Sequence, residues 1–191
     1  MDLRFEDFLA PVDGERLADH VTNSWSWFAP IAELSPIGIT RFGDVLLRDR
    51  DGAIYFLDTA FGILEKVGAT QEAFRARLPE LARAMLRVDL VRELEAHGVT
   101  LAHGQCYGFG LSPLLGGPVT CANVSPLDAG VVLAWLGQLV RSTVPMAEGH
   151  PIRVSSLGRR RREPSYGSLT KHARDRSSFA VIEPAATTPR A

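Results

Sequence analysis

The sequence contains few of the residues that build disulfide-linked, membrane-spanning or secreted proteins. Of its 191 residues only two are cysteines, Cys106 and Cys121, which are too few for a disulfide framework. We therefore expect both thiols to be reduced. No apolar run approaches the roughly 20 residues that span a bilayer, and the N-terminus lacks the pattern of a secretory signal. These absences predict a cytoplasmic protein that makes no membrane contact.

Motifs that bind phosphate or metal ions are missing as well. Neither G-x-x-x-x-G-K-[ST] nor G-x-G-x-x-G occurs, and no lysine lies between Lys66 and Lys171. The segment DRDG at residues 49–52 does not fit a calcium loop, because Leu47 would stand at the first ligand position. Histidine and cysteine side chains are present without the close pairing typical of zinc sites, at His97, His103, Cys106 and Cys121. The sequence therefore predicts no cofactor and no metal site.

Charge is distributed unevenly along the chain. Residues 157–191 hold eight Lys or Arg and three Asp or Glu, a net charge of +5, which leaves −6 on residues 1–156. The C-terminal part is rich in Arg, Ser and Pro and shows no hydrophobic periodicity, so we predict a disordered tail over residues 156–191. Residues 1–155 then form a single domain. We expect no direct nucleic-acid binding beyond weak contact through the tail.

Hydrophobic periodicity indicates an α+β domain. The pattern predicts a helix over residues 14–28 and then an antiparallel β-meander, whose strands cover residues 37–41, 45–48, 53–57 and 63–67. Asp51-Gly52 has the composition of a hairpin turn. Thr70 is expected to cap a helix, Pro79 to begin a second segment, and His97-Gly98 to end a third. Ser125 is expected to cap a last, buried helix over residues 126–140. The helices are predicted to pack on one face of the sheet.

The glycine-rich segment HGQCYGFGLSPLLGG covers residues 103–117. A catalytic Cys106 needs a base, and His103 would reach it only in a helix, which the surrounding glycines disfavour. His97 is the other base considered for a cysteine-dependent hydrolase. A free cysteine is more often a small buried apolar residue, so we interpret the role of the segment as structural.

Several motifs together resemble one bacterial family, the C-terminal domain of type VI secretion immunity proteins that protect against DNase toxins. This domain often follows a GAD-like domain. The shared motifs fall in order over residues 30–145 and are Phe42-Gly43-Asp44, Asp51-Gly52, Phe56-Leu57-Asp58, Gly104-Gln105-Cys106-Tyr107-Gly108-Phe109, Gly116-Gly117 and Leu136-Gly137-Gln138-Leu139. Two features depart from the family: residues 1–30 are too few for a GAD-like domain, and the arginine-rich tail is additional.

The resemblance implies a non-enzymatic binding protein that neutralises a cognate toxin by one-to-one contact. An acidic body suits a basic, nuclease-like toxin. The candidate contact residues are acids expected at turns or on a sheet face, namely Asp44, Asp49, Asp51, Asp58 and Glu65, although each turn acid also suits a purely structural role. The candidate structural motif residues are Gly43, Gly52, Gly104, Gln105, Cys106, Tyr107, Gly108, Gly116 and Gly117. The sequence leaves open the oligomeric state, a Cys106 hydrolase, and an interaction module unrelated to secretion.

Overall fold

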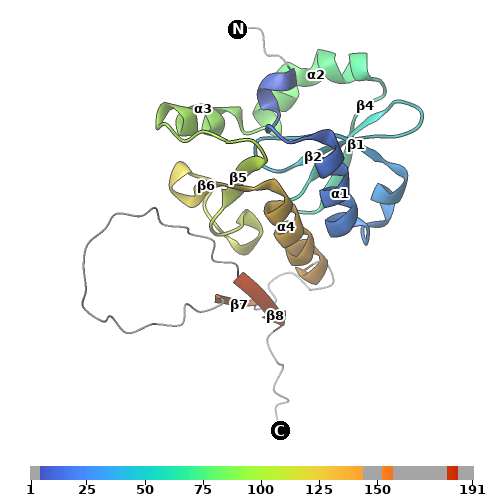
Figure 1. Ribbon diagram of the computed structural model, residues 1–191. Coiled ribbons are helices and arrows are strands. Elements are labelled where there is room, and N and C mark those ends of the chain that lie inside the picture. Colours follow the sequence, from blue (N-terminus) through green and yellow to red (C-terminus); the bar gives the residue numbers. More distant parts are fainter. Residues whose placement is uncertain (1–4, 144–151, 157–179, 185–191) are drawn as a thin grey trace, which may run out of the picture. The chain divides into compact units, whose positions relative to one another are not determined.

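The computed structural model describes residues 5–143, 152–156 and 180–184 (Figure 1). The chain divides into two compact units, Met1–Arg141 and Ser142–Ala191, which we describe separately. In the second unit, β7 (Ile152–Ser156) pairs with β8 (Ala180–Pro184) in an antiparallel ladder. The sequence predicted no regular structure from residue 156 onward, and β8 differs from that expectation. The rest of the predicted tail lies outside the described residues.

The first unit is built around the predicted β-meander. Its four antiparallel strands stand in the order β1-β2-β3-β4, with β1 at Ser35–Ile39, β2 at Val45–Arg48, β3 at Ile54–Asp58 and β4 at Ile63–Gly68. The turns use the expected glycines, since Gly43 has φ +83° and Gly52 has φ +90°. A residue with a Cβ is strained at these angles, whereas glycine is not. The α+β class and the meander are confirmed.

Four α-helices and a second, two-stranded sheet complete the described part of this unit. The helices are α1 (Gly14–Trp25), α2 (Gln71–Ala84), α3 (Val88–Ala96) and α4 (Ala129–Thr143). The second sheet pairs β5 (Gln105–Phe109) with β6 (Val124–Asp128). Short 3₁₀ turns lie at Phe5–Phe8, Ala29–Glu33, Pro113–Leu115 and Cys121–Asn123.

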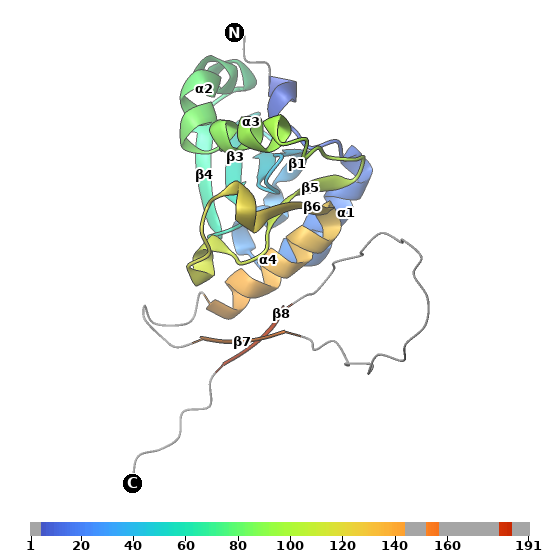
Figure 2. The ribbon, with the colours of Figure 1, turned by 90° about the vertical axis from the view of Figure 1, so that its left-hand side faces the viewer.

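The helices cover both faces of the meander, whereas the sequence predicted one. Alternate residues of a strand point to opposite faces. Leu46, Ile54 and Phe56 pack with Phe74 and Leu78 of α2 on one face. The intervening side chains Val45, Leu47 and Leu57 are equally buried and point the other way. Because β2 and β3 are apolar on both sides, a single helical layer cannot cover them, and α1 and α4 lie on the side opposite α2 (Figures 1 and 2).

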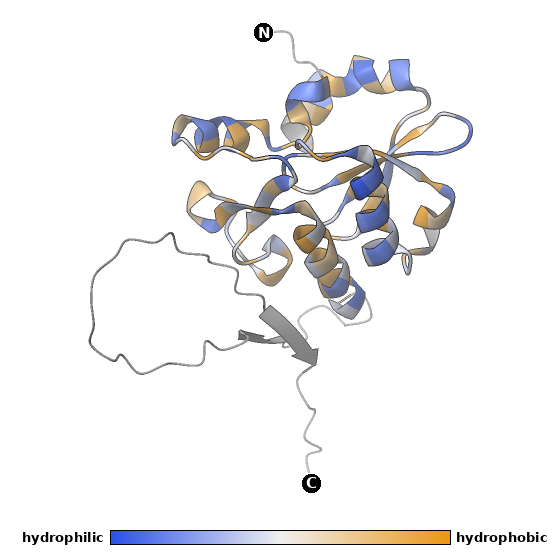
Figure 3. Ribbon diagram, viewed as in Figure 1, coloured by the Kyte–Doolittle hydropathy of each residue, from blue (hydrophilic) through white to orange (hydrophobic). Residues whose placement is uncertain are grey.

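Helices α1 and α4 pack closely against each other. The Trp25 indole Nε1 donates to the Leu133 carbonyl oxygen at 3.2 Å, and a Cβ at Gly137 would lie 2.6 Å from the Ser24 carbonyl oxygen. Glycine at position 137 therefore allows the two backbones to approach. Helix α4 is mainly hydrophobic along its length, as Figure 3 shows, and α1 is amphipathic, with Leu17, Val21 and Trp25 on its buried face.

Two predicted helix boundaries are wrong. Pro79 lies inside α2 and does not start a new segment. Leu78, Leu81 and Ala82 on either side of it belong to one core cluster, which holds both halves in a single helix. Ser125 and Pro126 belong to strand β6, and α4 begins only at Ala129. The carboxylate of Asp128 accepts a hydrogen bond from Val131 N at 3.0 Å and so serves as the cap that Ser125 was expected to be.

Candidate functional site

Asp44 was expected at an exposed turn, but the structure buries it. Its side chain is 1% exposed, and Arg87 Nη1 donates to its Oδ2 at 2.7 Å. The backbone N–H of Thr59 donates to Asp44 Oδ1 at 3.1 Å, and the Thr40 hydroxyl lies 3.4 Å from Oδ2. Asp44 is therefore not exposed at its turn, because Arg87 and Thr59, both distant in the sequence, reach its carboxylate.

Arg87 contacts the carboxylates of both Asp44 and Asp58, and these three side chains form a largely buried charged cluster. Arg87 Nη2 also lies 3.8 Å from Asp58 Oδ2, and its guanidinium stacks over the Phe42 ring at 5.6 Å. Burial raises the pKa of Asp44 to about 6, against the opposing attraction of Arg87. Asp58 is half-buried, and its Oδ1 accepts from Ala60 N at 2.9 Å, which orders the turn between β3 and β4. The cluster holds β2, β3 and the start of α3 together.

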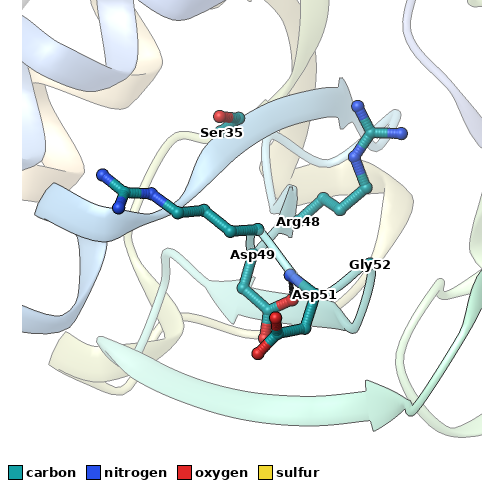
Figure 4. Close-up of a pocket in the computed structure, with 6 residues that line it drawn as sticks. Ser35, Arg48, Asp49, Asp51 and Gly52 are labelled. Carbon is teal, nitrogen blue, oxygen red and sulfur yellow. Dashed lines mark hydrogen bonds between the residues drawn. The ribbon is translucent and has the colours of Figure 1, made fainter.

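The hairpin between β2 and β3 presents a second pair of the predicted acids, Asp49 and Asp51. Residues of this hairpin and Ser35 line an open hollow of about 410 Å³ (Figure 4). Asp49 Oδ1 accepts from the backbone N–H groups of Asp51 at 3.0 Å and Ala53 at 2.8 Å, and Tyr55 Oη donates to Oδ2 at 3.2 Å. Partial burial acts to raise the pKa of Asp49, but these hydrogen bonds outweigh it and lower that pKa.

The five predicted acids therefore do not form one site. Asp44 and Asp58 meet around Arg87, Asp49 and Asp51 share the hairpin, and Glu65 stands exposed on β4. Of the five, Asp51 and Glu65 have exposed side chains. The carboxylate of Asp49 accepts hydrogen bonds from the backbone of the turn, as the structural interpretation expected. Whether any of these acids touches a partner stays a prediction.

Cys106 lies in a setting that suppresses thiol reactivity. The side chain is fully buried on β5, and burial, followed by the charges of Asp44 and Asp128, raises the pKa of its thiol far above the ordinary range. A nucleophilic cysteine needs the opposite shift. The two histidines considered as bases are exposed and paired elsewhere: His103 Nε2 lies 3.2 Å from Asp13 Oδ1, and His97 Nδ1 lies 2.7 Å from the Glu93 carbonyl oxygen.

The glycine-rich segment of residues 103–117 makes backbone contacts that connect neighbouring elements of the fold. Gly104 has φ +81°, accepts a hydrogen bond from Ala129 N at 2.9 Å and so connects β5 to the start of α4. A Cβ at Gly108 would lie 2.6 Å from Leu127 Cδ1 across the β5–β6 ladder. The Gln105 side chain accepts from Ala102 N at 2.9 Å, and Tyr107 Oη donates to the Val99 carbonyl oxygen at 2.8 Å. These contacts hold the backbone in place.

One feature that the sequence did not indicate is the loop of residues 110–123 between β5 and β6. Asn123 ties its two ends together, because its Nδ2 donates to the carbonyl oxygens of Leu111 and Pro118, both at 2.8 Å. Gly116 has φ +81°, and a Cβ at Gly117 would overlap the Leu111 carbonyl oxygen. Hydrogen bonds within the loop therefore hold it in a compact conformation.

The described residues contain no group of three or more His, Cys, Asp or Glu side chains arranged to hold a metal ion. Within the same residues, no helix has both the length and the apolar composition needed to cross a membrane.

Comparison with known proteins gives one partial match to a family model. No curated protein sequence matches the chain. Among solved structures, the crystal structure of Atu4351 from Agrobacterium tumefaciens is similar, with 22% sequence identity and a TM-score of 0.45 over 65% of this chain and 64% of that chain. Residues 73–140, from α2 into α4, match the model of the family described as T6SS immunity protein Tdi1, C-terminal. The resemblance to the C-terminal domain of type VI secretion immunity proteins is thus confirmed over these residues.

Proposed function

We propose that this protein is an immunity protein that protects its cell by binding a toxin delivered by type VI secretion. The observation that carries the proposal is the match of residues 73–140 to the Tdi1 C-terminal family. The matched residues include α3, the β5–β6 sheet and its loop, and Asn123 joins the two ends of that loop through hydrogen bonds. Such a protein acts by presenting a preorganised surface and needs no catalytic group.

The properties of Cys106 support binding over catalysis. A cysteine hydrolase requires a thiolate within reach of a base, whereas the Cys106 thiol is buried and its pKa is raised. His97 and His103, the two candidate bases, hydrogen-bond other groups at the surface. We therefore infer a non-enzymatic protein.

The charge of the described body supports a basic partner. Residues 5–143 contain 17 Asp or Glu and 11 Lys or Arg, a net charge of −6. Opposite charge accelerates association and favours correct partners over wrong ones. Toxins that act on nucleic acid carry basic surfaces, so a nuclease-like toxin suits this protein. We place the encounter in the cytoplasm, where such a toxin finds its substrate.

Rescue of a sensitive host tests this proposal. Each candidate toxin encoded beside this gene would be expressed alone, with the full-length protein, and with its Cys106→Ala variant. The expected result is equal protection by both forms and co-purification of the toxin with each. Protection by the wild type that Cys106→Ala abolishes, although the variant is folded, would favour the hydrolase. Absence of both protection and co-purification would overturn the immunity function.

A further inference from the structure

We propose that the loop of residues 110–123 is the apolar anchor of the toxin interface, and that acidic side chains of the neighbouring helix α3 meet a basic surface of the toxin around it. This inference rests on the proposed function and assigns its binding face. The partner it requires is a protein that presents an apolar pocket bordered by Lys or Arg side chains.

The loop exposes large apolar side chains to solvent. Leu111 is 42% exposed and Val119 is 52% exposed, and they are two of the four large hydrophobic residues exposed in the described part of the chain. The loop sequence, GLSPLLGGPVTCAN, contains no charged residue. A contiguous exposed apolar surface is typical of a protein interaction site, whereas isolated exposed apolar residues are ordinary.

The fold brings the backbone segments that carry these two side chains close together. Leu111 N donates to Asn123 Oδ1 at 2.9 Å, while Asn123 Nδ2 donates to the carbonyl oxygens of Leu111 and Pro118. Gly117 packs directly against the Leu111 carbonyl group, which leaves no space for a side chain there. Val119 follows Pro118 in the chain, so the backbone segments that carry Leu111 and Val119 lie side by side.

Hydrogen bonds within the loop hold its backbone in place before any partner binds. Ser112 is fully buried at the base of the loop, and its carbonyl oxygen accepts from Leu115 N at 2.9 Å and Gly117 N at 3.0 Å. Its hydroxyl accepts from Leu114 N at 3.3 Å. A preorganised loop loses little conformational entropy when it binds. Exposure of apolar side chains on so constrained a loop has no folding advantage, which points to recognition.

Charge complementarity identifies the partner. Helix α3 contacts the end of the loop, where burial, followed by the nearby Glu93 carboxylate, raises the pKa of the Cys121 thiol. The helix carries three acids, Asp89, Glu93 and Glu95, and one base, Arg92. Asp89 is 96% exposed with Arg92 only 3.8 Å away, and Glu95 pairs with Arg41. An apolar centre bordered by excess negative charge fits a basic protein surface with an apolar pocket.

The test measures binding of the full chain to a catalytically inactivated, purified form of the toxin encoded beside its gene. The loop variant is Leu111→Ser with Val119→Ser. The matched control is Phe61→Ser with Ile63→Ser, which removes the other two exposed apolar side chains and lies outside residues 73–140. We expect the loop variant to raise Kd at least about thirtyfold and the control less than about threefold. Melting temperatures report whether each variant is folded.

Two further variants keep the test decisive. Val119→Arg adds a positive charge at a half-exposed position and should weaken binding even if the double variant folds poorly. Asp89→Lys should slow association at low salt and have less effect at high salt. If the wild type binds tightly and folded loop variants bind equally tightly, the assigned face is wrong while the immunity function stands. If the wild type binds none of the neighbouring gene products, both proposals fall.

Discussion

Arg87 Nη1 donates to Asp44 Oδ2 at 2.7 Å, although 43 residues separate the two in the sequence. The pair joins the turn before β2 to the residue that precedes α3. Arg87 adopts φ 49°, a left-handed conformation that a non-glycine residue rarely takes, and its side chain thereby enters the cluster around Asp44. The contact links the sheet to the part of the chain that matches the immunity family.

Replacing Arg87 should therefore be far more harmful than replacing an exposed arginine. Arg87→Met leaves the Asp44 carboxylate buried without its counter-charge, and we expect the free energy of unfolding at pH 7 to fall by about 3–5 kcal/mol. Arg92→Ala removes an exposed pair and should cost less than about 1 kcal/mol. Urea denaturation of both variants measures the difference. Equal stability of the two would show that the buried pair contributes nothing.

Stability should also depend on pH through Asp44. Burial raises its pKa from 3.8 to about 6, so between these pH values the folded state binds more protons than the unfolded state. The stability due to protonated Asp44 is complete below about pH 4 and is lost as the pH rises through 6, by up to about 3 kcal/mol. Arg87 and Asp58 face the same carboxylate, and Arg87 stays charged over this pH range. Chemical denaturation from pH 4 to 7 should show this decline in the wild type relative to Asp44→Asn, and parallel curves would contradict it.

The two cysteines should differ in reactivity. Cys106 is fully buried with a raised thiol pKa, whereas Cys121 is partly exposed. A disulfide exchange reagent added to the native protein should modify Cys121 slowly and Cys106 only after unfolding. Mass spectrometry of the wild type and of Cys121→Ser identifies the modified residue. Rapid labelling of native Cys121→Ser would show that Cys106 is accessible and would reopen the question of a thiol enzyme.

The close packing of Gly117 gives another prediction. Gly117→Ala places a methyl group against the Leu111 carbonyl oxygen, where the backbone must shift, and should cost about 1–3 kcal/mol of stability. Gly14→Ala is the control, because nothing lies within 4 Å of its added Cβ at the start of α1. It should be neutral or slightly stabilising. Thermal unfolding of both variants measures the contrast, and a neutral Gly117→Ala would show that the loop yields easily.

The sequence predicted most of what depends on neighbouring residues. The strands of the meander, the glycine turn at Gly52 and the cap at Thr70 follow from local pattern and turn chemistry, and all are present. The start of α4 was placed three residues too early, because a short apolar segment fits a strand or a buried helix equally well.

Prediction from the sequence failed where contacts between distant residues decide whether a side chain is buried or how a loop is closed. Gly43-Asp44 has the composition of an exposed turn, and only the fold brings Arg87 and Thr59 to bury its carboxylate. Likewise Asn123 closes the loop at Leu111 from 12 residues away, which no local pattern reveals. The apolar surface that we assign to the toxin interface was therefore visible only in the structure.

Titration of toxin activity with the purified protein tests the central claim most directly. An immunity protein that acts by direct contact should reduce the activity in proportion to the amount added, reaching complete inhibition near one equivalent and releasing active toxin on denaturation and separation. Cys106→Ala should give the same titration. Complete inhibition by a small fraction of an equivalent, with lasting damage to the toxin, would mean that the protein is an enzyme and would contradict the account.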